Sequence, residues 1–107
     1  MIEVSHYLDS KGRDVFARWS ENLDREAAGR VEKALLRLAY GNTSSVKAVG
    51  GGVNELKIDF GPGYRVYFGW QGNTVGILLG GGTKKRQQQD IRQAQERWSD
   101  FKSRLRS

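Results

Sequence analysis

The segment Asn54–Phe68 constrains the fold most, because it has the residue pattern of a β-hairpin. Two runs of alternating apolar and polar residues flank Gly61–Gly63, a turn cluster in which glycine allows positive φ and proline fixes its own φ. The apolar members of the two runs fall on one face of the predicted sheet: Leu56, Ile58, Phe60, Tyr64, Val66 and Phe68. The hairpin therefore predicts a sheet with an apolar face on which other elements can pack.

The opposite face of this hairpin carries polar side chains. A loop of residues 61–63 alone would place Asp59 opposite Arg65 and Lys57 opposite Tyr67. Because strand side chains alternate, Lys57, Arg65 and Tyr67 share this face, which we expect to be exposed. It is the first candidate for a functional surface. Asp59 is the carboxylate most suited to a functional site, although a cross-strand ion pair with Arg65 would also account for its position.

Two helices are expected before the hairpin, after a short strand at residues 2–6. Asp9 or Ser10 is the expected N-cap of the first helix and Asp24 that of the second, which ends near Gly41. The second helix has apolar residues spaced at i, i+4, i+7, i+8 and i+11, namely Ala27, Val31, Ala34, Leu35 and Leu38. We expect both helices to form a helical hairpin on one face of the sheet.

The remaining segments complete one α+β domain. Residues 46–49 are either a short strand or an extended lead-in, and residues 74–79 form an apolar run typical of a strand buried on both faces. The glycines at 80–82 end that strand and let the backbone approach a bound group. Residues 87–105 have the apolar stripe of a helix packed on its own domain. The predicted order over residues 1–107 is β-α-α-β-β-β-α with an antiparallel sheet, the first strand lying at an edge or beside the last strand.

Composition excludes several classes of chemistry. The sequence has no cysteine, which rules out disulfides, thiol catalysis and thiolate zinc sites. Its single histidine, His6, has no partner for a two-histidine ribonuclease site, and no acidic cluster indicates bound magnesium. No long apolar run or signal-peptide core is present. We therefore expect a soluble cytoplasmic protein that uses no metal or cofactor and does not bind membranes.

Positive charge is concentrated near the end of the chain. Residues 84–107 carry eight Lys and Arg against three Asp and Glu, a net +5 out of the formal +6. Such asymmetry indicates a polyanion or an acidic partner, while a solvated basic helix is the alternative. Lys84, Lys85 and Arg86 follow the last predicted strand directly, so they are candidate RNA-binding residues.

The basic side chains suit one reaction in particular. Cleavage of an RNA phosphodiester needs a base for the ribose 2′-hydroxyl, charge stabilisation for the phosphorane oxygens and an acid for the leaving 5′-oxygen. A lysine whose pKa is depressed by neighbouring cations can act as base or acid, and arginine binds phosphate bidentately. Lys57, Arg65 and Lys84 are the candidates for these roles, although exposed Lys and Arg are also common on sheets.

Four stretches in fixed order resemble the RelE/ParE superfamily of type II toxins, in particular its HigB-like "addiction module killer" branch. They are residues 35–42, 46–59, 61–68 and 78–84. The resemblance implies a RelE-like fold and a small endoribonuclease that cuts mRNA at the ribosome without a metal. It also implies a cognate antitoxin, usually a protein with a helix-turn-helix DNA-binding domain.

Carried over by position, the resemblance gives each candidate a role. Arg65 corresponds to the arginine that clamps the phosphate and the transition state, and Lys57 to a base or electrostatic stabiliser. Lys84 would bind phosphate or protonate the leaving group, and Tyr67 would stack on a base or orient the ribose. After Gly82 no tyrosine follows, so the general acid and base stay unassigned. A ParE-like gyrase inhibitor and a non-catalytic member that binds only its antitoxin are the alternatives.

Overall fold

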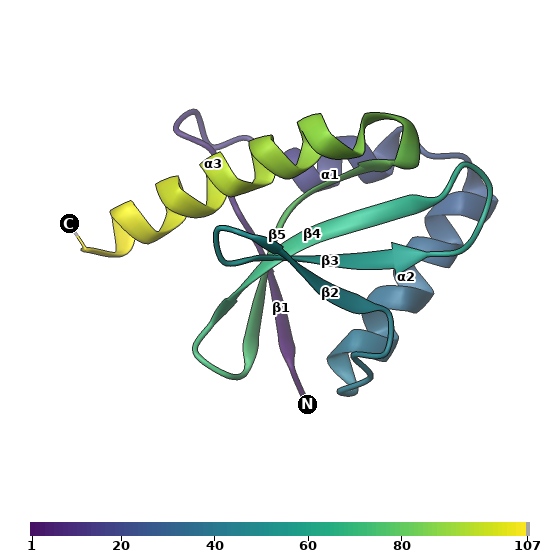
Figure 1. Cartoon of the computed structure of the whole chain (residues 1–107), viewed down its shortest axis with the longest axis horizontal. Helices are drawn as coiled ribbons and strands as arrows, with labels where there is room; N and C mark the ends of the chain where they lie inside the picture. The colour runs from purple at the N-terminus through teal and green to yellow at the C-terminus, as the bar shows by residue number, and fades with distance from the viewer. Residues whose placement is uncertain (107) are drawn as a thin grey trace.

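The computed structural model describes residues 1–106 as an α+β fold (Figure 1). Its strands are β1 (Glu3–His6), β2 (Val46–Gly50), β3 (Val53–Ile58), β4 (Tyr64–Gln71) and β5 (Val75–Thr83). Its helices are α1 (Val15–Glu21), α2 (Arg25–Ala39) and α3 (Gln87–Arg106), with a 3₁₀ turn, η1 (Lys84–Arg86), leading into α3. None of these helices is long and apolar enough to cross a membrane.

The five strands form one mixed sheet in the order β1-β5-β4-β3-β2. Strands β2 to β5 are antiparallel neighbours, whereas β1 runs parallel to β5. The α+β class, the two helices that pack on one face of the sheet and the C-terminal helix are confirmed, but the expectation of a wholly antiparallel sheet is wrong. No tight turn joins β1 to β5, so hairpin geometry does not dictate their relative direction. Of the two sequence alternatives for residues 46–49, the strand is the one observed.

Helices cover both faces of the sheet and create two cores. On one face, α1 and α2 pack against the apolar side of the β3–β4 hairpin; this core contains Phe16, Ala27, Val31, Leu38, Leu56, Ile58, Tyr64, Val66, Phe68 and Leu78. On the other face α3 crosses β5, β4 and β3 (Figure 1). The second core contains Tyr7, Val53, Tyr67, Ile77, Leu79, Ile91, Ala94 and Trp98. The apolar stripe of α3 therefore packs on its own domain, as the sequence predicts.

Two tryptophan rings pack directly on strand backbone, one on each face. A Cβ atom added to Gly69 of β4 would lie 2.5 Å from the Trp98 ring, and one added to Gly81 of β5 would overlap the Trp19 ring. Glycine is required at both positions because any side chain would occupy the space of the indole. The prediction that the glycines at 80–82 end the strand is wrong, because β5 continues to Thr83. These glycines instead admit side chains of the chain itself, from α1 and α3.

Helix capping agrees with the sequence at α2 and differs at α1. The Asp24 carboxylate caps α2 as predicted, accepting a hydrogen bond from the Ala27 backbone N–H at 2.8 Å. Helix α1 begins later than expected, because Asp14 is its N-cap in place of Asp9 or Ser10. Asp9 instead accepts backbone N–H hydrogen bonds within its own turn, so its carboxylate is already committed there.

The β3–β4 hairpin has a wider loop than predicted. Lys57 pairs with Arg65 and Glu55 pairs with Tyr67, so residues 59–63 form the loop and the predicted pairing of Asp59 with Arg65 is wrong. The loop widens because Gly63 N–H bonds the Phe60 carbonyl at 3.1 Å inside it. The register differs from the predicted one by two residues, since Arg65 pairs with Lys57 and not with Asp59. A shift by an even number of residues leaves each side chain on its face, so Lys57, Arg65 and Tyr67 remain on the same face.

Candidate functional site

The polar face of the β3–β4 hairpin lies largely under η1 and α3. Arg65 is 5% exposed, Tyr67 1% and Glu55 2%. The expectation that Arg65 and Tyr67 lie on an open face is therefore wrong, because α3 packs across the strands that carry them. Lys57 is different: its side chain is 52% exposed at the rim of the covered region. Of the predicted sheet residues, Lys57 alone is readily accessible.

Arg65 is held by a buried network of polar groups. Its Nε lies 3.7 Å from Oε2 of Glu55, and the Gln87 side chain donates a hydrogen bond to the same oxygen at 2.8 Å. Arg65 Nη1 donates to the Gly63 carbonyl at 2.6 Å. Removing either charge of such a pair leaves the other buried without compensation. Glu55 therefore has a defined role, fixing the guanidinium beside the hairpin loop.

Two buried polar atoms in this cluster lack a hydrogen-bond partner within residues 1–106, namely Arg65 Nε and the Tyr67 hydroxyl oxygen. Burial, followed by the negative charges of Glu55 and Asp90, raises the pKa of Tyr67 well above its ordinary value, so the phenol stays protonated. In this packing the Tyr67 ring cannot stack on a nucleobase. The Tyr67 hydroxyl and the Arg65 Nε–H group can therefore each form one more hydrogen bond.

Asp90 of α3 adds a second carboxyl to the region. Gly82 makes room for it, since a Cβ atom on that glycine would overlap the Asp90 carboxylate. Burial raises the pKa of Asp90, and the charges of Arg86 and Arg97 oppose that shift. The sequence reasoning gave neither Glu55 nor Asp90 a role in the site. The alternation that places Lys57 and Arg65 on one face also places Glu55 there, so the sequence pattern could have predicted Glu55 as a neighbour of Arg65.

Lys57 stands at the mouth of a hollow that reaches Arg65. The two residues are directly paired across β3 and β4, and Lys57 Nζ lies 3.4 Å from Asp59 Oδ1. The hollow has a volume of about 390 Å³ and is lined by Ser44, Ser45, Val46, Lys47, Glu55, Lys57, Asp59 and Arg65. An anion in it would meet the Lys57 ammonium first and the edge of Arg65 behind it.

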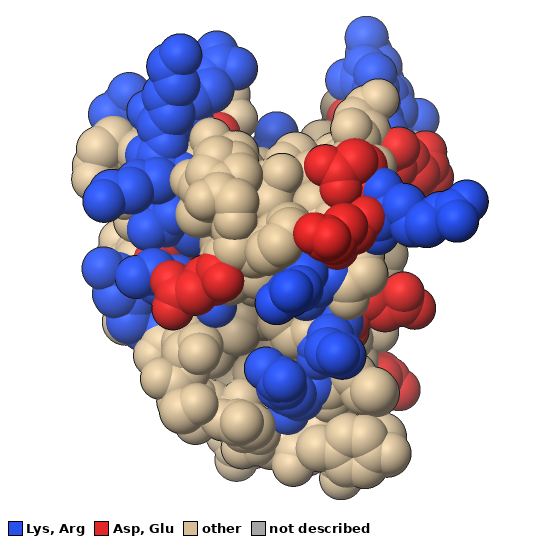
Figure 2. All heavy atoms as spheres, turned by 90° about the vertical axis from the view of Figure 1, so that its right-hand side faces the viewer, with Lys and Arg blue, Asp and Glu red and all other residues tan. Residues whose placement is uncertain are grey.

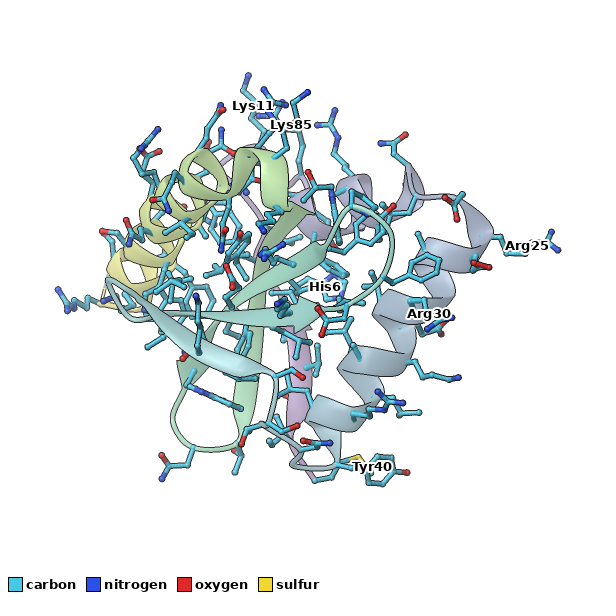
Figure 3. The ribbon with its side chains drawn as sticks, turned by 45° about the vertical axis from the view of Figure 1, so that its right-hand side comes forward. His6, Lys11, Arg25, Arg30, Tyr40 and Lys85 are labelled. Atoms are coloured by element: carbon cyan, nitrogen blue, oxygen red, sulfur yellow. The ribbon has the colours of Figure 1, made fainter. Side chains whose placement is uncertain are left out.

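The three predicted basic residues of η1 are exposed but differ in their relation to Arg65. The Lys84 backbone N–H donates to the Gly63 carbonyl at 3.0 Å, and that carbonyl also accepts from Arg65. Lys84 is therefore anchored beside the Arg65 guanidinium. The side chains of Lys84, Lys85 and Arg86 all lie outside the lining of the hollow, and Figure 3 shows Lys85 projecting outward at the top of the molecule. The structure thus brings Lys57 and Arg65 together at the hollow and anchors the Lys84 backbone beside Arg65.

His6 has a structural explanation. Its Nδ1 is hydrogen-bonded to the Asp14 carboxylate at 2.7 Å, and its ring meets Phe16 edge-on at 5.4 Å between centroids. Asp14 is the N-cap of α1, so this contact ties β1 to the start of that helix. Within the described part of the chain, no group of three or more His, Cys, Asp or Glu side chains could hold a metal ion.

The fold and this site define a small α+β protein whose helix-covered mixed sheet carries a buried Arg–Glu pair beside an exposed lysine. No family model matches the chain. It is 41% identical over 80 residues to an uncharacterized protein of Haemophilus influenzae, an alignment that covers 74% of this chain and 81% of the relative. The chain therefore belongs to the same family as that protein.

Proposed function

We propose that this chain is the toxin of a type II toxin–antitoxin module, a metal-independent mRNA endoribonuclease of the RelE/ParE superfamily. The observation that carries the proposal is the hollow lined by both Lys57 and Arg65, with the Lys84 backbone bonded to the hairpin loop beside Arg65. The ordered sequence resemblance supports it, as does the sheet covered by a helical hairpin on one face and a C-terminal helix on the other.

The proposed reaction is an in-line displacement at phosphorus. The ribose 2′-oxygen attacks the phosphorus atom as it loses its proton, the bond from phosphorus to the 5′-oxygen breaks, and that oxygen gains a proton. Lys57, whose ammonium is paired with Asp59, stabilises the attacking oxygen, and the 2′-hydroxyl proton passes to solvent. Arg65, fixed by Glu55, neutralises the phosphorane oxygens, and Lys84 serves the leaving oxygen. Tyr67, being buried, supports the sheet face in this scheme.

Asp90 joins the candidates for proton transfer. Its raised pKa favours a protonated carboxyl at a higher pH than is usual for aspartate, and Gly82 brings it against β5. A carboxylic acid near a cationic cluster can deliver a proton to a leaving oxygen. Lys84 and Asp90 are therefore alternative proton donors, which single substitutions of each would distinguish.

The proposed partners are a protein antitoxin with a helix-turn-helix domain, the mRNA and the ribosome. The net charge of +5 on residues 84–107 would draw the protein toward ribosomal RNA. Such attraction weakens as salt rises, because counterions compete for the phosphates. Association with ribosomes is therefore expected to be strongest at low salt.

One observation favours a second candidate, a ParE-like inhibitor of DNA gyrase. Arg65 and Tyr67 are both buried, so a substrate would reach only the edge of Arg65 that lines the hollow. A binding protein has no need for wider access to these residues. The two candidates differ in outcome, since gyrase inhibition leaves mRNA intact and blocks DNA supercoiling.

A cell-free translation reaction with a labelled reporter mRNA tests the proposed function. The wild-type chain should cut the mRNA at discrete sites, whereas Lys57→Ala should lower the cleavage rate by at least about tenfold. Lys11→Ala is the matched control, since it removes an exposed lysine in a loop before α1. If the wild-type chain leaves the mRNA intact and inhibits purified gyrase, the nuclease proposal is wrong and the gyrase inhibitor takes its place.

A further inference from the structure

A basic groove lies between α2 and the β3–β4 hairpin. Its volume is about 270 Å³, and its lining includes four cationic side chains, Arg30, Lys33, Arg37 and Lys57, but a single acidic one, Asp59. The three residues on α2 are spaced at i, i+3 and i+7, which places them on one side of the helix. Figure 2 shows this side of the molecule, where Lys and Arg side chains gather in several groups.

The groove is partly preorganised. The Arg30 guanidinium lies over the Phe60 ring, 4.5 Å from its centroid, which restricts the motion of an otherwise flexible side chain. Asp59 pairs with Lys57 at 3.4 Å but is itself 86% exposed, so solvent screens its charge. With four cationic side chains and one carboxylate in its lining, the groove carries net positive charge.

The other lining groups suit a phosphate backbone better than a peptide. Asn42, Ser44 and Ser45 supply amide and hydroxyl groups that can donate to phosphate oxygens. Of the apolar residues in the lining, Leu56 and Ile58 are buried in the core, Ala34 and Phe60 are partly buried, and the Phe60 ring is covered by Arg30. A protein partner needs accessible apolar pockets for its anchor residues. The groove instead offers repeated positive charge among hydrogen-bond donors.

The groove and the hollow that reaches Arg65 adjoin each other around the end of β3. Ser44, Ser45, Lys57 and Asp59 line both. Arg30 and Arg37 are seven residues apart, about 10 Å along a helix, so the cations of α2 can contact successive phosphates of one strand. A strand that follows the cations of α2 would therefore arrive at Lys57 and then at Arg65.

We propose that the groove between α2 and β3 binds the sugar–phosphate backbone of single-stranded RNA and leads it to Lys57 and Arg65. This inference rests on the proposed nuclease function for its choice of RNA. It assigns to α2 a role in binding that neither the predicted site nor the sequence resemblance includes. The residues that carry it are Arg30, Lys33 and Arg37.

Fluorescence anisotropy with a labelled 12-nucleotide RNA tests this groove. Every 2′-oxygen of the probe is methylated, so binding is measured without cleavage. The groove variant Arg30→Gln/Lys33→Gln/Arg37→Gln is compared with the control Lys11→Gln/Arg18→Gln/Arg25→Gln, which changes the net charge equally at exposed positions. Figure 3 shows Lys11 and Arg25 projecting outward, Arg25 from the start of α2.

The groove variant should bind the probe at least about tenfold more weakly, and the slope of log K against log salt should fall by about 2, from three lost phosphate contacts at ~0.7 each. The control should stay within about twofold of wild type. Circular dichroism verifies folding, and Lys33→Gln alone, at an exposed position, should also weaken binding. Equal losses in both triple variants, or none in the groove variant, would overturn the proposal.

Two further results separate the groove from the nuclease function. If the wild-type protein binds the probe through the groove but leaves mRNA intact, the proposed nuclease function is contradicted and the proposal that the groove binds RNA stands. If the groove variant cleaves mRNA and binds the probe as tightly as wild type, the proposal that the groove binds RNA is contradicted and the nuclease proposal stands. Tighter binding of a labelled poly-glutamate peptide than of the RNA would make the groove a site for an acidic protein and overturn its assignment to RNA.

Discussion

Replacing the charges of the buried Glu55–Arg65 pair separates its structural role from its proposed role on phosphate. In the Arg65→Met variant the Glu55 carboxylate, 2% exposed in the native chain, loses its cationic partner and keeps the hydrogen bond from the Gln87 amide. A buried charge deprived of its partner costs about 3–5 kcal/mol. A domain of this size has a total free energy of unfolding of about 5–15 kcal/mol, so the variant should lose at least about a fifth of it.

The double variant Glu55→Gln/Arg65→Met should lose less than the sum of the single variants. The Nε–Oε2 separation is 3.7 Å, longer than a hydrogen bond, so the coupling free energy should be about 1–2 kcal/mol, below that of a well-formed pair. Urea unfolding followed by tryptophan fluorescence measures all four states of the cycle. Lys57→Met, at an exposed position on the same strand, should stay within about 0.5 kcal/mol of wild type.

Additive losses, within about 0.5 kcal/mol, would refute the reasoning that these charges compensate each other. The result also decides how toxicity assays are interpreted. Arg65→Ala alone can abolish activity by unfolding the chain, whereas Lys57→Ala removes an exposed group of the same site. Lys57 is therefore the cleaner position for testing function.

Three further changes test the packing around the site. Tyr67→Phe should raise the free energy of unfolding by about 1 kcal/mol, because it removes a buried hydroxyl without a partner within residues 1–106; a loss above 1 kcal/mol in urea unfolding would show that the hydroxyl is satisfied. Gly69→Ala should cost about 2–3 kcal/mol, since its Cβ would lie 2.5 Å from the Trp98 ring, and an unchanged melting temperature would contradict that contact. Burial and the Asp100 carboxylate raise the pKa of Tyr7 to about 12, so the folded state favours the protonated phenol; the stability it contributes is complete below its ordinary value of 10.0 and is lost as pH rises toward 12. Denaturation at stepwise pH should show a shallower decline over that window for Tyr7→Phe than for wild type, and identical profiles would count against the assignment.

Local patterns predicted the elements and the faces of the hairpin. The period of two in residues 54–68 determined that Lys57, Arg65 and Tyr67 share a face, and this held although the loop is two residues longer than expected. Register escaped prediction because it depends on hydrogen bonds inside the loop around Gly63, which compete with a tighter turn. The N-cap at Asp24 could be predicted from the sequence because an N-cap depends only on residues close to it in the chain.

Burial of the site could not be read from the same patterns. Whether Arg65 is open or covered depends on where α3 crosses the sheet, a long-range arrangement between segments about 30 residues apart. Strand glycines carried the available signal: Gly69 and Gly81 in otherwise apolar strands indicate close packing of a large group on the backbone. The basic groove was missed for a related reason, since charges on α2 have the same pattern whether they face solvent or a groove.

The central claim is that this chain cuts mRNA through a site that includes Lys57. The most direct measurement is primer extension on total cellular RNA after brief induction of the wild-type chain, Lys57→Ala and the control Lys11→Ala. Discrete new 5′ ends inside coding regions should appear with wild type and the control and be absent with Lys57→Ala. Growth arrest by the wild-type chain with messages that remain intact would contradict the claim.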